Sequence, residues 1–244
     1  MYKAIERNEF TLLYQPKVAT YSYKIVGIEA LLRWNHPEWG LVFPAKFIPI
    51  AEETDLIVHL GDWVLKQACL QNKAWQQAGL SPVRVSVNFS SKQFMRKDML
   101  AVLEQILQET QLDPKWLEIE VTENTLLQIG ENDILDAIKK MGITLSLDDF
   151  GTGYSSLSYL KQLKPNVLKL DKSFIQQIGQ NHEDNAVVKA VIGVAHDLRI
   201  SIIAEGVETK DQLYFLRKLK CDETEMTVEE INGKKSKSVY GYTS

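Results

Sequence analysis

Short apolar segments alternate with amphipathic segments along the chain, and this alternation constrains the fold more than any other feature. The expected strands are Phe10–Gln15, Gly27–Arg33, Val83–Asn88, Trp116–Val121, Thr144–Asp148, Val167–Leu170 and Ser201–Ala204. Apolar residues between them recur at the spacing of helices with one buried face. Parallel neighbouring strands require such helical crossovers, so the order predicts an α/β fold built on a parallel sheet.

The length and the helix boundaries agree with a single domain. A long helix is expected from about Leu60 to Ala78, because Gly79 is typical of the position just past a helix end. Thr209 is expected to cap a later helix. The 244 residues contain no low-complexity linker, and an α/β barrel has about 250 residues. Seven strands are visible, whereas a closed barrel of this type has eight.

Charge and cysteine content argue against several classes of partner. The formal net charge of −4 disfavours binding to nucleic acid polymers or to an anionic membrane surface. Cys69 and Cys221 lack CxxC spacing, and the histidines lack the pairing of a helix-borne zinc site. Because no long apolar run and no signal peptide is present, we expect no membrane insertion and a cytoplasmic location. The chain could also be the cytoplasmic module of a longer, membrane-anchored protein.

Two adjacent carboxylates end one of the expected strands. Asp148 and Asp149 follow an apolar run, and Gly151 and Gly153 come soon after them. Neighbouring strand residues point to opposite faces, so both acids can serve one site only if the strand ends there and the backbone turns. The glycines permit such a turn, and carboxylates on such a loop suit hard divalent cations. A solvated Asp-Asp turn is the alternative.

Polar side chains recur at the ends of the expected strands, where α/β barrels hold their active sites. They are Glu29, Asn88, Glu118, Glu120, Thr122, Glu123, Asp148, Asp149, Lys169 and Glu205. Taken singly, each has a simpler explanation: Glu29 could pair with Arg33. Glu118 and Glu120 could line the solvent face of an antiparallel strand, and Lys169 could extend to solvent. Charges in apolar strands are costly to bury unless they are paired or metal-bound, so their joint occurrence favours one active site.

Seven short motifs occur in order between Tyr14 and about Asp222. They are Glu29-Ala30-Leu31, Phe47-Ile48-Pro49-Ile50-Ala51-Glu52, Asn88-Phe89-Ser90, Glu120-Val121-Thr122-Glu123, Asp148-Asp149-Phe150-Gly151-Thr152-Gly153, Lys169-Leu170-Asp171 and Ala204-Glu205-Gly206-Val207-Glu208. This series resembles the EAL-domain cyclic-di-GMP phosphodiesterase family. The resemblance implies a TIM-like (β/α)8 barrel whose first strand runs antiparallel. It also implies hydrolysis of one phosphodiester of cyclic di-GMP to give linear pGpG.

The resemblance further implies roles for individual residues. Two Mg²⁺ or Mn²⁺ ions would be held by Glu29, Asn88, Glu120, Asp148 and Asp149. Lys169 would contact the nucleophilic water or phosphate oxygens, and Glu205 would fix that lysine or a metal-bound water. The substrate pocket would be lined by Gln15, Leu31 and Arg33. The loop after the paired aspartates would be supported by Thr122 and Glu123.

The chain departs from the family after Asp222, so residues 1–222 are expected to form the barrel domain and residues 223–244 a divergent C-terminal segment. The family continues there into an eighth strand and a Gln-Gly-Tyr motif whose glutamine faces the active site. The segment is polar and lysine-rich, with strand character only around Val239–Tyr242, where Tyr240 would replace the glutamine. The last βα unit is therefore expected to be divergent or incomplete, which would expose sheet edges and lower stability.

The intact acidic set favours a metal-dependent phosphodiesterase acting on cyclic di-GMP in bacterial signalling. The alternative is a catalytically weak or inactive cyclic-di-GMP receptor, because the altered C-terminus could spoil the geometry of the site. An unrelated sugar-phosphate barrel enzyme is disfavoured, since the series of motifs would then be a coincidence. The family also implies a homodimer and, in a parent protein, fused sensory or diguanylate cyclase domains.

Overall fold

A computed structural model describes residues 1–129, 133–151, 160, 163–180 and 182–225. These residues fall into two compact units. The first unit comprises Met1–Tyr14, Glu29–Val121 and Thr125–Thr144, and the second comprises Gln15–Ile28, Thr122–Asn124 and the residues from Leu145 onward. None of the described helices combines the length and the apolar character needed to span a bilayer.

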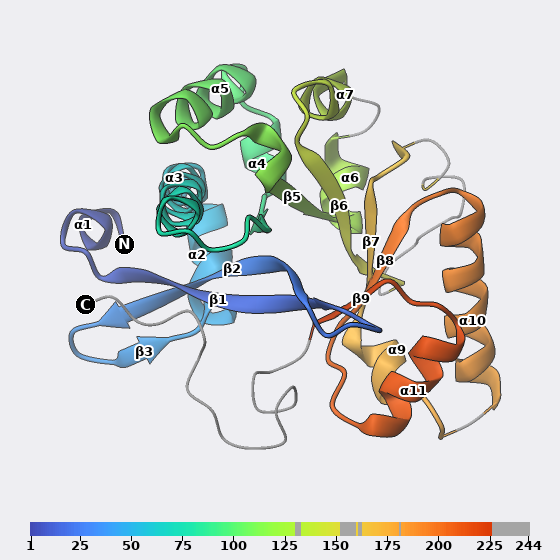
Figure 1. The fold of residues 1–244 in the computed structure, drawn as a ribbon. Helices are drawn as coiled ribbons and strands as arrows, with labels where there is room; N and C mark the ends of the chain where they lie inside the picture. The colour runs from blue at the N-terminus through green and yellow to red at the C-terminus, as the bar shows by residue number, and fades with distance from the viewer. Residues whose placement is uncertain (130–132, 152–159, 161–162, 181, 226–244) are drawn as a thin grey trace. The chain divides into compact units, whose positions relative to one another are not determined.

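Strands and helices alternate in the order expected from the sequence (Figure 1). The strands are β1 (Phe10–Ala19), β2 (Ile25–His36), β3 (Gly40–Val42), β4 (Arg84–Asn88), β5 (Leu117–Thr122), β6 (Thr144–Phe150), β7 (Val167–Leu170), β8 (Ser201–Ala204) and β9 (Glu223–Glu225). The helices are α1 (Tyr2–Glu6), α2 (Pro44–Glu53), α3 (Leu56–Gln77), α4 (Ser91–Phe94), α5 (Met99–Thr110), α6 (Glu123–Ile129), α7 (Asp133–Lys140), α9 (Lys172–Gln176), α10 (His182–Asp197) and α11 (Lys210–Lys218). A 3-10 turn, η1 (Pro114–Trp116), precedes β5.

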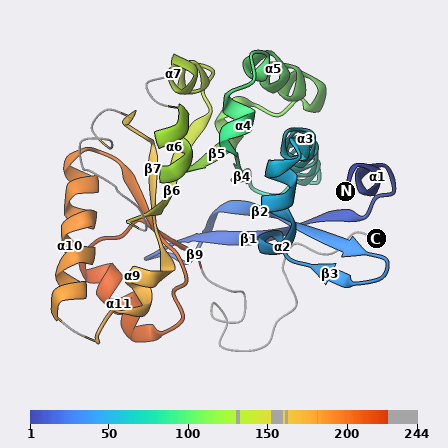
Figure 2. The same ribbon diagram turned by 180° about the vertical axis from the view of Figure 1, so that it is seen from behind.

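The first unit holds the strand series β5-β4-β2-β3. β4 and β5 are parallel, and β2 and β3 form an antiparallel pair. Val85, Val87, Leu117 and Ile119 of the parallel pair are fully buried, as β-branched and other apolar residues are in a sheet covered by helices. The helices α3 and α5 lie side by side, and Figure 2 shows the same pair from behind.

The second unit holds the strand series β1-β9-β8-β7-β6. The strands from β6 to β9 are parallel to their neighbours, whereas β1 pairs antiparallel with β9. Helix α10 contacts β8 and buries Val188, Ile192 and Ala195. The antiparallel direction of β1 agrees with the expectation for the first strand.

The helix boundaries follow the predicted signals. α3 begins at Leu56, earlier than predicted, and ends at Gln77, with Gly79 at a φ of +85° in the left-handed region. Thr209 caps α11: its hydroxyl accepts a hydrogen bond from the Gln212 backbone N–H at 3.2 Å. The Gln212 side chain accepts one from the Thr209 N–H at 2.9 Å, which completes a capping box.

Two strands were missed, and β1, β2 and β6 are longer than predicted. β1 continues four residues beyond the predicted end at Gln15, because Lys17, Val18 and Ala19 pair with β9. β3 is a short antiparallel addition to β2. β9 follows Asp222 directly in a segment without apolar residues, so its strand character comes from pairing with two neighbours. Val239–Tyr242, where a strand was expected, lies outside the described residues.

Candidate active site

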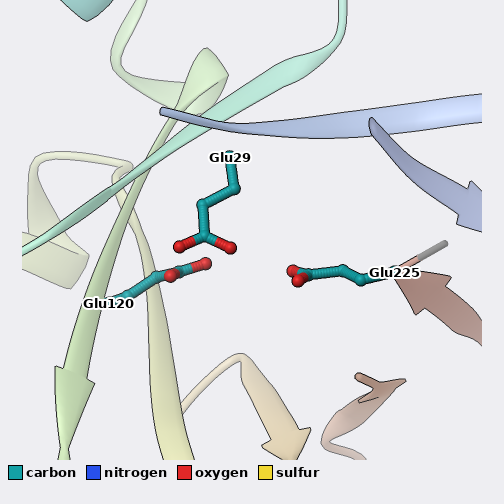
Figure 3. A group of neighbouring side chains, drawn as sticks. All are labelled: Glu29, Glu120 and Glu225. Carbon is teal, nitrogen blue, oxygen red and sulfur yellow. The ribbon is translucent and has the colours of Figure 1, made fainter. Parts of the chain in front are cut away.

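Three of the predicted metal ligands lie together in the first unit. Glu29 lies in β2, Asn88 ends β4, and Glu120 lies in β5. The Asn88 Nδ2 donates a hydrogen bond to Glu29 Oε1 at 2.8 Å, and the parallel register sets Asn88 beside Glu120. The carboxylates of Glu29 and Glu120 point toward one another in Figure 3 and bring oxygens within 4.8 Å.

Burial excludes the solvated alternative for β5. Glu118 and Glu120 are both 0 % exposed, and the strand is parallel to β4 instead of antiparallel. Glu118 lies 3.3 Å from the Arg84 guanidinium, which compensates its charge. Glu29 is also buried. Buried carboxylates require cationic or hydrogen-bonding partners, and the arrangement of Glu29, Asn88 and Glu120 supplies oxygen ligands suited to a hard cation.

In the second unit a β-bulge brings Asp148 and Asp149 to one site. The pairing of β6 with β7 shifts register between Leu147 and Phe150, and Asp149 has a φ of +54°. This left-handed residue breaks the strand alternation that would send the two carboxylates to opposite faces. Each of them brings an oxygen within 4.8 Å of Glu205 and of the other. The backbone therefore turns at Asp149 itself, before the glycines to which the sequence assigned the turn.

A hydrogen bond between Gly151 and Glu123 connects this bulge to the first residue of α6. Gly151 has a φ of +96° and donates its backbone N–H to Glu123 Oε1 at 2.8 Å. A Cβ at this glycine would lie 2.4 Å from the Phe174 ring, so no other residue fits without displacement. Thr122 is the last residue of β5. Gly153, the second glycine of the loop, lies outside the described residues.

Lys169 is the centre of the charged groups in the second unit. Its side chain is 1 % exposed, so it does not extend to solvent. Its Nζ lies 2.6 Å from Glu205 Oε1, 3.3 Å from Asp148 Oδ1 and 3.5 Å from Glu225 Oε1. Several carboxylates around one buried ammonium favour its charged form. This geometry keeps a proton donor fixed beside the paired aspartates.

The three predicted substrate residues are half-buried strand residues. Gln15 lies in β1 of the second unit, and Leu31 and Arg33 lie in β2 of the first. The Arg33 guanidinium lies over the Phe43 ring at 5.3 Å and donates to the Leu32 carbonyl at 2.8 Å. Burial lowers the pKa of Arg33, although the nearby charge of Glu29 acts to raise it. The charge of Glu29 therefore acts on Arg33, while its Oε1 accepts the hydrogen bond from Asn88.

Sequence reasoning missed two charged residues of the second unit. Lys17 and Glu225 are buried, and their charged atoms lie 3.8 Å apart. Lys17 could have been recognised, because its charge stands next to Val18 and two residues after the expected strand Phe10–Gln15. Glu225 carries no such signal, because it stands among other polar residues after Asp222.

The chain matches the model of the EAL domain over residues 1–225. It belongs to the EAL-domain family. The MucR protein of Pseudomonas aeruginosa, a bifunctional diguanylate cyclase/cyclic di-GMP phosphodiesterase, is 42% identical over 90% of this chain and 32% of its own length. The cyclic di-GMP phosphodiesterase PdeR of Escherichia coli K12 is 38% identical over 88% of this chain and 33% of its own. The chain thus spans about a third of the length of these relatives.

Solved structures of EAL domains share its fold. The structure of the PaMucR phosphodiesterase in complex with c-di-GMP is 41% identical, with a TM-score of 0.86 and coverage of 92% of both chains. An EAL domain protein from Listeria monocytogenes is 32% identical, with a TM-score of 0.79 and coverage of 92% of this chain and 88% of that one. The predicted fold class, an α/β barrel of the TIM type, is confirmed by this similarity.

Proposed function

We propose that this EAL domain is a metal-dependent phosphodiesterase that hydrolyses cyclic di-GMP to linear pGpG. The observation that carries the proposal is the buried Lys169 beside Asp148 and Glu205, with the acidic residues of both units intact. Two relatives that cover most of the chain are described as cyclic di-GMP phosphodiesterases, which supports the same activity.

We propose that two Mg²⁺ or Mn²⁺ ions are held by Glu29, Asn88, Glu120, Asp148 and Asp149. Four carboxylates would balance the four positive charges, and the amide oxygen of Asn88 would add a neutral ligand. Such ions prefer oxygen ligands, which is the donor type that these residues offer. When bound, such ions would supply Lewis acidity to the oxygens of the reacting phosphodiester.

The remaining residues would bind the substrate, orient the Lys169 ammonium group or donate a proton. Lys169 holds a proton at Nζ, where it can donate to the attacking water or to a phosphate oxygen. Glu205, at 2.6 Å, fixes the direction of that ammonium group, and such supporting contacts often affect activity nearly as much as the ligands. Arg33 can contact a phosphate through two N–H groups, and we propose that Gln15 and Leu31 line the same pocket.

The loop after Asp149 would be held by the start of α6. Glu123 Oε1 accepts the Gly151 N–H, so loss of this carboxylate would release the backbone next to the paired aspartates. We propose that Thr122 and Glu123 act as supports of this loop. In this role Glu123 acts through the backbone of Gly151 and does not touch the substrate.

The wider setting is inferred from the family. We propose that the domain forms a homodimer and that a parent protein joins it to sensory or diguanylate cyclase domains, as the bifunctional name of MucR suggests. Because its substrate would be a nucleotide second messenger, we place the activity in the bacterial cytoplasm.

The direct test is chromatographic separation of cyclic di-GMP from pGpG after incubation with Mg²⁺ or Mn²⁺. We expect pGpG to form, and a chelator to abolish it. Glu29→Ala and Asp148→Ala should each abolish turnover while the circular dichroism spectrum of the folded domain is kept. A variant with near-normal turnover would remove its residue from the metal site, and intact cyclic di-GMP in the wild-type reaction would contradict the proposed enzyme.

A cyclic-di-GMP receptor with weak or no turnover is the second candidate. It is favoured by the divergent sequence after Asp222, because a displacement of about 1 Å can lower a rate about a hundredfold. Calorimetric binding of cyclic di-GMP without any product would select the receptor over the enzyme.

A further inference from the structure

Two buried lysines share one buried glutamate in the second unit. Lys17 of β1 and Lys169 of β7 are each 1 % exposed, and Glu225 of β9 is 4 % exposed. Glu225 Oε1 lies 3.8 Å from the Lys17 Nζ and 3.5 Å from the Lys169 Nζ. The same carboxylate oxygen is therefore placed between two ammonium groups.

Backbone register puts these side chains together. β1 and β9 pair so that Lys17 is opposite Glu225. β8 and β9 are parallel with Ala204 beside Thr224, so the next residues are Glu205, directly after β8, and Glu225 of β9. These two glutamates contact the same Lys169 Nζ. β9 thus gives the lysine a second glutamate from the strand next to that of Glu205.

Three carboxylates form ion pairs with Lys169. A lysine ammonium has three N–H donors and no acceptor. Asp148, Glu205 and Glu225 place carboxylate oxygens at 3.3, 2.6 and 3.5 Å from the Lys169 Nζ. These three negative charges attract the ammonium group from different strands and restrict its position.

We propose that Glu225 is a positioning residue that holds Lys169 in its working orientation, and that Lys17 is the cation that makes a buried carboxylate tolerable there. A buried charge is strongly unfavourable when its partner is removed, so Glu225 needs a second cation while Lys169 also serves Asp148 and Glu205. The positioning role rests on the proposed phosphodiesterase activity, whereas the pairing of Lys17 with Glu225 does not.

The pairing is tested by a double-mutant cycle in urea unfolding. Lys17→Met and Glu225→Gln should each lower the folding equilibrium constant by about 100-fold, because each leaves a buried charge with one partner fewer. The folding equilibrium constant of the double variant should be at least about tenfold higher than the value expected if the two single effects were additive. Additive effects would overturn the pairing.

An exposed ion pair provides the matched control. Lys66 and Glu109 lie 2.7 Å apart with side chains that are 47 % and 40 % exposed. In the cycle of Lys66→Met and Glu109→Gln we expect a coupling of less than about fivefold, because exposed pairs contribute little. An equal coupling in both cycles would show that burial adds nothing to the Lys17–Glu225 pair and would overturn its proposed importance.

The positioning role is tested by separating kcat, KM and metal affinity in Glu225→Gln. We expect kcat to fall about tenfold or more with KM changed less than about threefold, since substrate contacts are kept. The calorimetric Kd for Mn²⁺ should stay within about twofold. A kcat within about twofold of wild type would overturn the positioning role, and a loss of Mn²⁺ affinity of about tenfold or more would make Glu225 a metal ligand instead.

Failure of the proposed function is distinguishable from failure of this inference. If the wild-type domain forms no pGpG, the phosphodiesterase is contradicted and with it the positioning of Lys169 for catalysis. The unfolding cycles need no substrate, so they decide the Lys17–Glu225 pair in either case.

Discussion

Two helical glycines have very different surroundings. A Cβ added to Gly61 of α3 would lie 2.2 to 2.7 Å from the side-chain amide of Gln93. Gln93 is buried, and its Oε1 accepts hydrogen bonds from the Ser90 backbone N–H and hydroxyl at the start of α4. The amide therefore cannot move away without loss of this cap. Gly193 of α10 is exposed and has no atom within 4 Å of the added Cβ.

We expect Gly61→Ala to lower the free energy of unfolding by about 1–3 kcal/mol through overpacking and loss of the α4 cap. Gly193→Ala is the matched control and should raise it by about 0.5–1 kcal/mol, because alanine has the higher helix propensity. Urea unfolding of both variants measures the difference. A Gly61→Ala variant as stable as Gly193→Ala would contradict the close contact with Gln93.

Both cysteines are free and buried, so we expect their thiols to be unreactive. Burial raises the pKa of the Cys69 thiol, and likewise of the Cys221 thiol, to about 12. Because the unfolded thiol has a pKa of about 8.5, the folded state favours the protonated form. This contribution to stability is complete below about pH 8.5 and is lost as the pH rises toward 12.

At pH 8 we expect iodoacetamide to alkylate Cys69 and Cys221 about a thousandfold more slowly in the native protein than in urea, because thiolate is the nucleophile. Mass spectrometry of tryptic peptides over time measures both rates. Rapid alkylation of either residue in the native state would show that its thiol is accessible and its pKa is not raised.

Among the secondary-structure elements, one buried side-chain amide joins α3 to the residues that directly precede β4 and β5. Asn72 is 1 % exposed, and its Nδ2 donates to the Val83 carbonyl at 3.0 Å and to the Trp116 carbonyl at 3.2 Å. These carbonyls directly precede the strands that carry Asn88 and Glu120. The helix therefore helps to set the positions of both strands in the first unit.

We expect Asn72→Leu to lower the free energy of unfolding by about 2–4 kcal/mol, because two buried carbonyls lose their donor. Gln77→Leu, at an exposed position of the same helix, is the control and should change it by less than about 0.5 kcal/mol. Thermal and urea unfolding measure both. Equal stability of the two variants would mean that water or other donors replace the amide.

At the scale of the whole molecule, β9 is the last described element and it pairs on both sides within the second unit. It joins β8 in parallel and β1 in antiparallel direction, and the EAL-domain match ends at the same residue, Glu225. Removing a strand that is paired on both sides exposes two sheet edges. The position of a chain end relative to β9 should therefore matter for stability.

We expect a chain ending at Glu225 to keep its Tm within about 4 °C of the full sequence, since that shift corresponds to about 1 kcal/mol. A chain ending at Asp222 should lose about 10 °C or more, or fail to fold, because β9 is absent. Calorimetry of the three chains measures the difference. A large loss already at Glu225 would show that residues 226–244 contribute to the fold.

Local sequence signals were enough to predict the order of most elements, the family and most of the acidic residues that the structure buries. Periodicity of apolar residues and helix-capping residues are local signals, so seven strands and the cap at Thr209 could be predicted. The series of motifs sufficed for the family, and the buried positions of Glu29, Glu120 and Lys169 agree with charges that were out of place in apolar strands.

How these residues come into contact depends on pairing between segments that are distant in the sequence. The left-handed bulge at Asp149 depends on the pairing of β6 with β7, and the strand character of β9 depends on β1 and β8. The contact of Lys17 with Glu225 joins residues near opposite ends of the described chain. Such features arise from pairing and burial between distant segments, for which a local pattern carries no signal.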